Sequence, residues 1–372
     1  MRWVIAGGGT GGHLFPGMAI AEAFVEREKG NEALFIGTER GIEARILAGG
    51  KFPLRMIQAR PIKGRSFLGK LKALWSLPKA VSEASSILKE FQPQVVLGVG
   101  GYASGPTLLA ASLLGMKRAI HEQNVIPGMT NRILKRFSQK IFVSFEETRK
   151  YFPEEKTIVT GNPIRKEILK GRERKKGDRF TLLIFGGSAG AHRINLTMME
   201  ALRSLDQMKS SLKVIHQTGK DDLDFVSRGY QEKGFDALVR PFLEDMAPYY
   251  QMADLVICRS GASTVAELAV CGKAAILIPY PFAAHNHQWI NAQKLVERGA
   301  ATMIEDRALN GPSLAKGILD LYSHPEELGR MEEKIQQVGR PGAAEEIVDH
   351  CYAMIEKNSK YQISNVKSMT ND

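Results

Sequence analysis

Short apolar runs rich in valine and isoleucine alternate along the chain with longer stretches whose apolar residues recur at helical spacing. In the first half we predict strands at Arg2–Ala6, Ala33–Ile36, Leu54–Ile57, Val95–Val99, Ala119–His121, Ile141–Ser144 and Thr157–Thr160. Between them, Met18–Glu28 and Leu71–Glu90 have the period of amphipathic helices. This alternation predicts an α/β fold with parallel sheets wound by helices.

The alternation of strand-like and helix-like segments is interrupted by a polar, basic stretch, Ile164–Asp178, and resumes after it. In the second half we predict strands at Thr181–Phe185, Lys213–Gln217, Ala237–Arg240, Leu255–Cys258, Ala275–Ile278 and Ala301–Ile304. Each half opens on a strand followed by glycines and a small hydroxyl residue, within Gly7–His13 and Gly186–Gly190. We therefore expect two Rossmann-like, doubly wound domains facing across a cleft, with ligands beyond the carboxyl ends of the strands.

Breaks in the pattern set the expected domain limits. The first domain is predicted at 1–162 and the second at 163–341, where Pro341 and Gly342 interrupt the pattern. A helix is predicted at 342–357, and the polar, aperiodic tail at 358–372 is predicted to be disordered.

Composition places the chain among globular enzymes, because 44% of its 372 residues are hydrophobic and 24% are charged. Cys258, Cys271 and Cys351 are too few and too scattered for a disulfide framework, which favours the cytosol. The first residues do not resemble a signal peptide. No window approaches the roughly 20 apolar residues of a membrane-spanning helix, so any membrane contact is expected to be peripheral.

The formal net charge of +11 suits nucleic acid, anionic lipid or a phosphorylated substrate. One basic stretch is also amphipathic and predicts a membrane-surface contact. Its members are Phe67, Leu68, Lys70, Leu71, Lys72, Leu74 and Trp75. The alternative is a helix that docks on its own sheet. The second basic cluster, within 165–179, has few apolar residues and is typical of a solvated linker.

Two glycine-rich segments in the first half follow predicted strands. The loop Gly7–Gly12 ends on His13, and Gly98–Pro106 precedes a predicted helix. Glycines there let backbone N–H groups approach an anion, and a histidine beside them can remove a proton near neutral pH. The alternatives are tight turns and a loop-packing histidine. The spacing does not fit a P-loop, because no Gly-Lys-Ser/Thr follows.

Polar side chains also end the strand at His121, in the run His121-Glu122-Gln123-Asn124. Such residues are costly at a buried strand end unless they face a cleft or are hydrogen-bonded, so we expect a functional role.

In the second half, Cys258–Thr264 joins a strand to a helix that carries Glu267. Arg259 with small residues at a helix N-terminus suits a diphosphate, and Glu267 can accept hydrogen bonds from a ribose. His285 and His287 lack acidic or cysteine partners, so we predict no metal site there. The D-x-D at Asp222–Asp224 is better explained as an acidic helix start.

Taken in order, these motifs resemble the MurG family of glycosyltransferase family 28. The resemblance covers nearly the whole chain, from Gly8–His13 through Gly100–Pro106, His121–Asn124 and Gly161–Arg165 to Cys258–Glu267. It implies the GT-B fold and an inverting, UDP-N-acetylglucosamine-dependent hexosyltransferase of peptidoglycan synthesis, a process tied to cell shape and division. The implied acceptor is the lipid-linked muramyl-pentapeptide, whose C4 hydroxyl receives the sugar in a β-1,4 link to give lipid II. The final helix is expected to return to the N-terminal domain.

The resemblance also assigns site residues. It makes His13 the candidate base for the acceptor hydroxyl, with His121, Glu122 and Tyr102 beside it, and His121 or Glu122 as alternative bases. The acceptor diphosphate is assigned to Gly8, Gly9, Gly100, Gly101 and Ser104. The UDP-N-acetylglucosamine donor is assigned to Thr10, Gly11, Gly12, Asn124, Arg165, Ser188, Leu243, Arg259, Ala262, Ser263, Thr264, Glu267, His287, Gln288 and Asn291. Family members can carry paired glutamines where this chain has His287-Gln288.

No cofactor is expected, because Arg259 and a helix N-terminus can stabilise the leaving diphosphate without a metal. Expected partners are the donor, the lipid-linked acceptor, an anionic membrane surface on its cytoplasmic face, and other cell-wall synthesis proteins. Three alternatives are a UDP-N-acetylglucosamine 2-epimerase, a basic nucleic-acid-binding protein and a nicotinamide dehydrogenase. No basic stripe interleaved with aromatic residues supports the second, and no acidic residue closes the second strand as the third requires.

Overall fold

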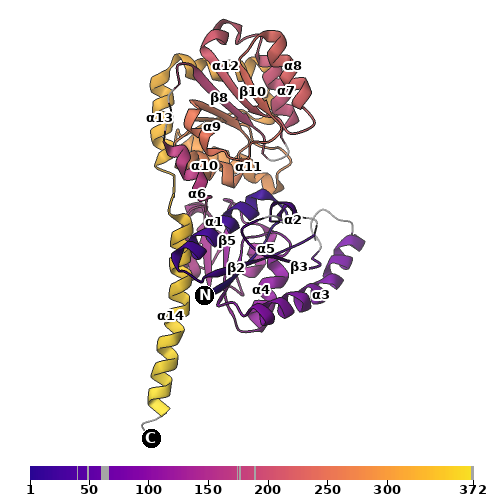
Figure 1. Cartoon of the computed structure of the whole chain (residues 1–372), viewed down its shortest axis with the longest axis vertical. Helices are drawn as coiled ribbons and strands as arrows, with labels where there is room; N and C mark the ends of the chain where they lie inside the picture. Colours follow the sequence, from indigo (N-terminus) through magenta and orange to yellow (C-terminus); the bar gives the residue numbers. More distant parts are fainter. Residues whose placement is uncertain are drawn as a thin grey trace. The chain divides into compact units, whose positions relative to one another are not determined.

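The computed structural model describes residues 1–39, 41–47, 50–59, 67–173, 175, 177–187 and 190–369, without the side chains of 42, 45, 67–75 and 357–369. Contacts divide the chain into two units (Figure 1). Unit 1 comprises Met1–Arg165 and Gly342–Asp372, and unit 2 comprises Lys166–Pro341. Among the described helices, none is long and apolar enough to cross a membrane.

The described residues of unit 1 form a seven-stranded parallel sheet in the order β3-β2-β1-β4-β5-β6-β7. Its strands are β1 Arg2–Ala6, β2 Glu32–Gly37, β3 Leu54–Met56, β4 Val95–Gly98, β5 Lys117–Glu122, β6 Lys140–Val143 and β7 Thr157–Val159. Each coincides with a predicted strand to within two residues. Valine and isoleucine buried on both faces of a parallel sheet explain why continuous apolar runs predicted these strands.

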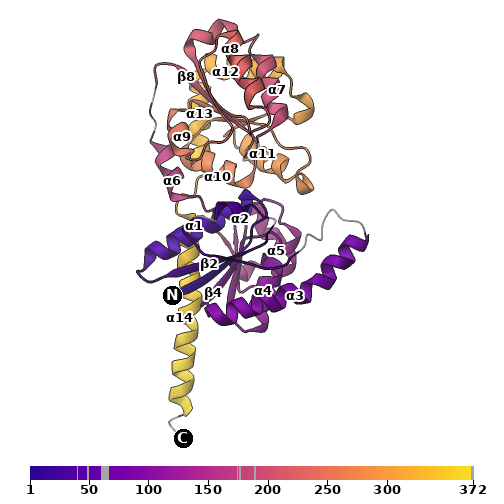
Figure 2. The same ribbon diagram turned by 45° about the vertical axis from the view of Figure 1, so that its right-hand side comes forward.

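Helices cover both faces of the unit 1 sheet (Figure 2). On one face lie α1 (Gly11–Arg27) and α14 (Ala343–Met369), which pack around Trp3 and Phe24. On the other face lie α3 (Phe67–Phe91), α4 (Ser104–Leu113) and α5 (Met129–Leu134). The predicted helix Met18–Glu28 covers the C-terminal part of α1 and ends one residue beyond it, and Leu71–Glu90 lies within α3.

Helix α14 returns to unit 1, as the family resemblance implies. The Tyr352 ring lies 6.0 Å from the Trp3 ring and 6.3 Å from the Phe24 ring. The Asn31 amide donates to the Tyr352 hydroxyl at 2.8 Å. Among the described residues, α14 continues to Met369, beyond the predicted end near 357. The segment has no glycine or proline to end it.

The described residues of unit 2 form a six-stranded parallel sheet in the order β10-β9-β8-β11-β12-β13. Its strands are β8 Phe180–Phe185, β9 Leu212–Gln217, β10 Ala237–Arg240, β11 Leu255–Cys258, β12 Ala275–Leu277 and β13 Thr302–Met303, all of them predicted. Helices α7 (His192–Ala201), α8 (Leu223–Lys233), α12 (Gly311–Ser323) and α13 (Pro325–Gln336) pack on the face that holds Leu182 and Ile184.

The structure contains further helical segments besides these. They are α2 Ile42–Ile46, η1 Glu146–Tyr151, η2 Glu154–Lys156, α6 Lys166–Leu169, η3 Lys170–Arg172, η4 Asp206–Ser211, α9 Ala247–Met252, α10 Ala262–Cys271, η5 Ala284–Asn286, α11 His287–Glu297 and η6 Asp306–Ala308.

Each sheet has one point where the strand order reverses. In unit 1 it lies between β1 and β4, and in unit 2 between β8 and β11. In open α/β sheets, ligands bind beyond the carboxyl ends of the strands at such a point. The glycine-rich loops predicted as sites follow these four strands. The fold therefore gives each unit one ligand position.

Candidate active site

The two glycine-rich segments of unit 1 pack backbone against backbone. At Gly101, which has φ +83°, an added Cβ would lie 2.2 Å from the Gly8 carbonyl oxygen. At Gly7, an added Cβ would lie 2.7 Å from the Gly100 carbonyl oxygen. Side chains at these positions would push the loops apart. The structure thus brings the two predicted anion-binding loops together at the β1–β4 switch point.

Ser104, predicted to contact the acceptor diphosphate, instead ties these loops together. Its side chain is fully buried, and its Oγ accepts a hydrogen bond from the Gly100 amide at 3.0 Å. The same hydroxyl lies 2.6 Å from the Ala6 carbonyl oxygen, to which it donates. A hydroxyl used in this way is not presented to a ligand, so the direct-contact prediction for Ser104 is not retained.

His13 lies in the first turn of α1, half-buried between the two loops. Its Nδ1 lies 3.0 Å from Gln123 Oε1. Gly100, with φ +93°, makes room for the ring, because an added Cβ there would lie 2.8 Å from it. Among the described residues, the other ring nitrogen, Nε2, has no hydrogen-bond partner. His13 therefore has one nitrogen anchored and one available.

His121 is fully buried and both of its ring nitrogens are used. Nε2 lies 3.2 Å from the Gly161 carbonyl oxygen, and Nδ1 lies 3.1 Å from Gln123 Nε2. Burial lowers the pKa of His121 from 6.5 to about 4, the Gly161 hydrogen bond opposes this, and nearby His13 lowers it further. His121 is therefore neutral at neutral pH and has no free nitrogen to accept a substrate proton.

Glu122 is also buried, and its carboxylate organises the loop that follows β5. It accepts hydrogen bonds from the Asn124 amide at 3.0 Å, the Gly128 amide at 3.0 Å and the Asn131 side chain at 2.9 Å. Each of its two oxygens therefore has donors within the protein. Of the three candidate bases, only His13 presents an acceptor atom without a partner among the described residues.

A residue that the sequence analysis missed, Glu43 of α2, holds the first glycine loop. Its buried carboxylate accepts from the Gly9 amide at 2.7 Å and from the Thr38 amide at 2.9 Å. Added Cβ atoms at Gly8 and Gly41 would lie 2.3 Å and 2.0 Å from it. The Gly9 amide, predicted to hold the acceptor diphosphate, is thus bound to a carboxylate of the protein. Only the spacing of these glycines along the chain could have hinted at such a partner.

Other predicted residues of unit 1 lie around the same loops. Thr10 precedes α1, and Gly11 and Gly12 form its first turn, where amides lack helical partners. The Arg165 guanidinium lies 4.7 Å from the centre of the Phe15 ring of the same helix. Tyr102 is 47% exposed and packs beside Gly9.

Tyr102 also borders an apolar cavity of about 350 Å³ formed by α3, α4 and α5. Its lining includes Leu77, Pro106, Leu109, Met129 and Ile133. Met129 and Ile133 are exposed, at 48% and 56%. The predicted membrane-contact side chains of residues 67–75 lie outside the described part of the structure, as does Ser188 of the donor set.

In unit 2, a cavity of about 550 Å³ lies at the β8–β11 switch point. It is lined by Gly186, Gly190, Ala191, His192, Arg193, Arg259, Tyr280, Pro281, Phe282, Gln288 and Asp306. Two predicted donor residues, Arg259 and Gln288, therefore line one cavity. The Arg259 Nη1 donates to Asp306 at 2.8 Å and to the Pro279 carbonyl at 3.0 Å. Asp306 was not predicted, and it fixes the guanidinium at the cavity wall.

Helix α10 begins beside Arg259. Ala262, Ser263 and Thr264 form its first turn, whose amides have no helical acceptors and can bind an anion. The Ser263 hydroxyl is buried without a hydrogen-bond partner among the described atoms. One turn later, Glu267 accepts a hydrogen bond from the Tyr250 hydroxyl at 3.0 Å.

The other predicted donor residues are held by internal hydrogen bonds. The Leu243 amide donates to Gln217 at 2.8 Å, which leaves its carbonyl for a ligand. Gln288 accepts from the Tyr280 amide at 2.9 Å, and the Asn291 amide donates to the Ser260 carbonyl at 3.3 Å. His287 Nδ1 donates to the Ala284 carbonyl at 2.7 Å. His285 and Asn286 precede it with φ of 55° and 53°, a strained geometry typical of ligand-binding turns.

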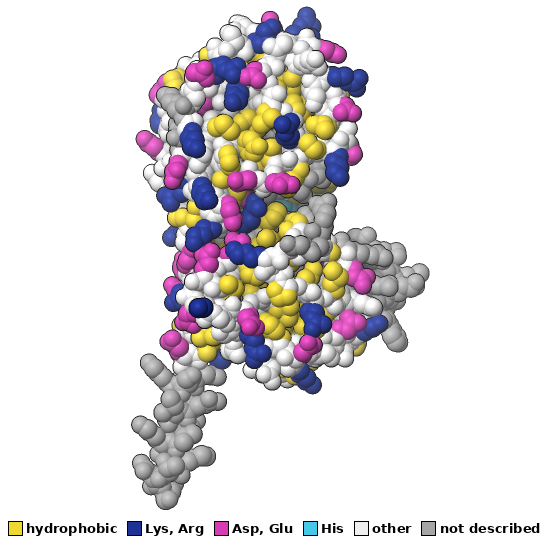
Figure 3. Space-filling model, viewed as in Figure 1, with side chains coloured by type: hydrophobic (Ala, Val, Ile, Leu, Met, Phe, Trp, Pro, Cys, Tyr) yellow, Lys and Arg dark blue, Asp and Glu magenta, His cyan; other side chains and the backbone are white. Residues whose placement is uncertain are grey.

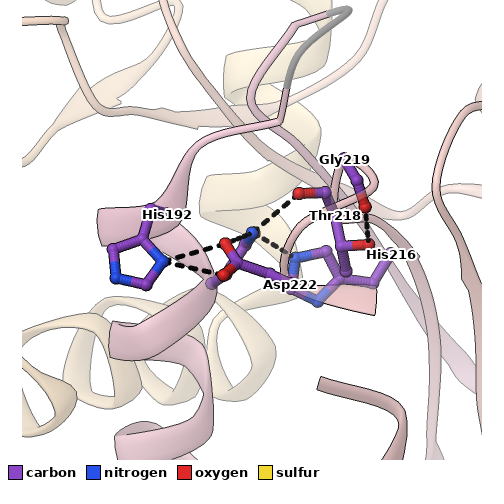
Figure 4. Close-up of polar contacts among 6 residues, drawn as sticks. His192, His216, Thr218, Gly219 and Asp222 are labelled. Carbon is purple, nitrogen blue, oxygen red and sulfur yellow. Dashed lines mark hydrogen bonds and ion pairs between the residues drawn. The ribbon is translucent and has the colours of Figure 1, made fainter. Parts of the chain in front are cut away.

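A second histidine network, not predicted from the sequence, reaches the unit 2 cavity (Figure 4). His192 Nδ1 lies 2.8 Å from an Asp222 carboxylate oxygen. The Asn195 side chain donates to Asp222 at 2.7 Å and accepts from His216 at 3.0 Å. Burial lowers the pKa of His216 to about 3, although Asp222 opposes this. Asp222 precedes α8, as predicted, but its carboxylate serves His192 rather than the helix.

Metal ligation is not apparent in the described part of the chain, where no three His, Cys, Asp or Glu side chains cluster suitably.

Comparisons with known proteins identify the family of the chain. The N-terminal and C-terminal domains of glycosyltransferase family 28 match residues 3–143 and 181–347. A relative from Myxococcus xanthus (strain DK1622) is 51% identical over 94% of this chain and 92% of its own length. It is named UDP-N-acetylglucosamine–N-acetylmuramyl-(pentapeptide) pyrophosphoryl-undecaprenol N-acetylglucosamine transferase.

Two solved structures place the fold. A crystal structure of MurG from Acinetobacter baumannii is similar with a TM-score of 0.77 and 32% identity, over 95% of this chain and 99% of that one. A UDP-N-acetylglucosamine 2-epimerase from Listeria monocytogenes has a TM-score of 0.68 over 96% and 97% of the two chains, but 16% identity, so it shares the fold alone. On the strength of its two matched domains and its full-length relatives, the chain belongs to glycosyltransferase family 28 and to the MurG family within it.

Proposed function

We propose that this protein transfers N-acetylglucosamine from UDP-N-acetylglucosamine to the C4 hydroxyl of the muramyl residue of undecaprenyl-pyrophosphoryl-muramyl-pentapeptide. The product is lipid II, the disaccharide-pentapeptide precursor of peptidoglycan. The observation that carries the proposal is 51% identity, along 94% of the chain, to a transferase named for this reaction. Each unit's ligand position at its switch point supports one substrate per unit.

His13 is the proposed general base. Its Nε2 is the only free acceptor atom among the three candidate bases, since the His121 nitrogens and the Glu122 carboxylate are hydrogen-bonded internally. As His13 takes the C4 proton, the hydroxyl oxygen attacks the anomeric carbon from the face opposite UDP. The bond from that carbon to the diphosphate breaks, its electron pair leaves with UDP, and the configuration inverts.

The leaving diphosphate is proposed to bind in the unit 2 cavity without a metal. The Arg259 guanidinium at the cavity wall and the free amides of the first α10 turn offer positive charge where negative charge develops. Glu267 is proposed to bind the ribose and the Leu243 carbonyl the uracil. In unit 1, the paired glycine loops and Tyr102 are proposed to hold the acceptor diphosphate.

A peripheral position on the anionic cytoplasmic face of the membrane completes the proposal. The apolar cavity beside Tyr102 suits the lipid of the acceptor. Exposed Ile133 and Arg132 on α5 are followed by exposed Arg136 in the next turn, a combination that favours an anionic lipid surface. On the face seen in Figure 3, by contrast, basic and acidic side chains are interspersed rather than gathered in a stripe for nucleic acid. Other cell-wall synthesis proteins are proposed partners.

The test is UDP release from UDP-N-acetylglucosamine, with and without the lipid-linked acceptor, in EDTA. We expect acceptor-dependent release and a disaccharide product, with faster turnover on anionic than on zwitterionic vesicles. Donor binding without acceptor-dependent transfer would contradict the function. Loss of activity in EDTA that Mg²⁺ restores would contradict metal independence alone.

A further inference from the structure

The side chain of Gln123 joins the two histidines of unit 1 and has only one possible orientation. Its Nε2 lies 2.8 Å from the Val99 carbonyl oxygen, which can only accept a hydrogen bond. The atom facing Val99 must therefore be the amide nitrogen, and Oε1 must face His13 at 3.0 Å. Gln123 is 1% exposed, so water does not compete for these bonds.

This orientation decides which nitrogen of His13 carries a hydrogen. Because an amide oxygen can only accept, the His13 Nδ1 facing it must donate. In the neutral ring, the lone pair then lies on Nε2, which is the atom that can remove a proton.

His121 completes the chain from its buried end. The Gly161 carbonyl can only accept, so His121 Nε2 carries the hydrogen and donates to it at 3.2 Å. His121 Nδ1 is then an acceptor, and it takes the second amide hydrogen of Gln123 at 3.1 Å. The low pKa of His121, about 4, keeps this ring neutral and its Nδ1 available as an acceptor. These hydrogen bonds therefore run in one fixed direction. His13 donates to Gln123, Gln123 donates to His121, and His121 donates to the Gly161 carbonyl.

We propose that Gln123 and His121 are positioning residues that fix His13 as the Nδ1–H tautomer and so aim its basic Nε2 at the acceptor hydroxyl. The inference rests on the proposed function. During transfer, the C4 proton moves to His13 Nε2 and the imidazolium keeps its Nδ1–H bond to Gln123 Oε1. No proton passes to the amide.

The experiment uses the full-length protein labelled with ¹⁵N-histidine. Long-range ¹H–¹⁵N spectra distinguish the two neutral tautomers from the cation, and the His13 signal is identified by its absence in His13→Gln. In the wild type we expect the Nδ1–H tautomer. Gln123→Met keeps the side-chain length but removes the acceptor oxygen, so we expect that tautomer preference to be lost. We expect kcat to fall roughly tenfold to a hundredfold with an unchanged KM for UDP-N-acetylglucosamine.

Gln123→Glu returns an acceptor oxygen to His13 but places its other oxygen against the Val99 carbonyl, where the amide nitrogen donated. It should restore the Nδ1–H preference but at most a small part of kcat. Asn31→Ala is the matched control. It removes another buried amide of unit 1, bonded to the Phe24 carbonyl and the Tyr352 hydroxyl, without touching His13. It should leave the tautomer and kcat unchanged.

An Nε2–H tautomer in the wild type would overturn the inference without need of any variant. So would a Gln123→Met spectrum in which His13 is unchanged. Absence of acceptor-dependent UDP release by the wild type would instead contradict the proposed function, whichever tautomer the spectrum reports.

Discussion

The two units carry a histidine at the same place in their architecture and use it differently. His13 lies seven residues after Ala6, the end of β1, and His192 lies seven residues after Phe185, the end of β8. Both lie in the first turn of the following helix, and both anchor Nδ1 on a side chain from a neighbouring loop. The partner of His13 is an amide oxygen, whereas the partner of His192 is the Asp222 carboxylate.

The difference in partner teaches what each position is suited to do. An amide fixes the hydrogen of a ring without adding charge, which suits a neutral base. A carboxylate also fixes the hydrogen, and it holds the His192 ring at the wall of the unit 2 cavity, where a ligand can meet its other nitrogen. The two similar loops therefore differ in chemistry because the partner of His13 is Gln123 and the partner of His192 is Asp222. The predictions below test that distinction in order of expected effect.

Replacing His13 should have the largest effect. His13→Ala removes the base, so kcat should fall by about 10²- to 10⁴-fold while the KM for UDP-N-acetylglucosamine stays near wild type. His192→Ala should do the opposite, raising the donor KM more than it lowers kcat. Both follow from UDP release measured over a range of donor concentrations. Near-normal turnover by His13→Ala would end the contrast between the two histidines.

Acid should weaken unit 1 through His121. Its pKa is lowered to about 4, so the unfolded chain, with an ordinary value of 6.5, binds the proton first as the pH falls. The full free energy of unfolding is present above pH 6.5 and falls as the pH approaches 4, the pKa of His121 in the folded protein. The loss between pH 7.5 and pH 5 is about 2 kcal/mol.

The measurement compares wild type with His121→Asn by urea unfolding at those two pH values. A Trp289→Phe background restricts fluorescence to Trp3 and Trp75 of unit 1. The His121→Asn protein should lose less stability on acidification, by about 2 kcal/mol. Equal losses in the two proteins would show that His121 is not held neutral by burial.

Crowding the His13 ring should also lower turnover. In Gly100→Ala, the new methyl group would lie 2.8 Å from the ring, at a backbone φ of +93°. We expect kcat to fall about tenfold or more, together with a backbone cost of about 1–3 kcal/mol in stability. Gly30→Ala is the matched control, because Gly30 has the same φ of +93° with nothing within 4 Å of its added Cβ. It should lose stability but keep kcat; equal kcat losses would assign the effect to strain alone.

The smallest effect is expected at Asp222. Asp222→Asn replaces one of the two acceptor oxygens that hold His192 and Asn195 by a donor, so the Kd for UDP should rise roughly threefold to tenfold, measured by calorimetry. Asp206→Asn removes an exposed carboxylate of unit 2 that pairs with Lys209, and it should leave the Kd unchanged. A wild-type Kd in Asp222→Asn would remove the carboxylate from any role in donor binding.

Most of the fold could be predicted because its strands are buried on both faces and read as continuous apolar runs. The residues of the site were harder to predict from the sequence. His13, Arg259 and Gln288 stand in recognisable motifs, but Glu43 and Asp306 reach their partners from the short helices α2 and η6, which the pattern did not predict. Asp222 looked like a helix start, and it is one, yet its contact with His192 joins segments thirty residues apart. Ser104 was assigned to a ligand and Glu122 to proton transfer because a motif does not reveal which way a side chain points.

Helix α14 also has a consequence for how the protein is made. Domains usually fold in the order in which the ribosome releases them, beginning with the N-terminal one. Here unit 2 is a continuous segment, Lys166–Pro341, whereas the Trp3–Phe24 face of unit 1 is covered by Tyr352 and its neighbours on α14. The N-terminal domain is therefore completed last, after the C-terminal domain has been synthesised. Until then its aromatic face is exposed to the cell's chaperones.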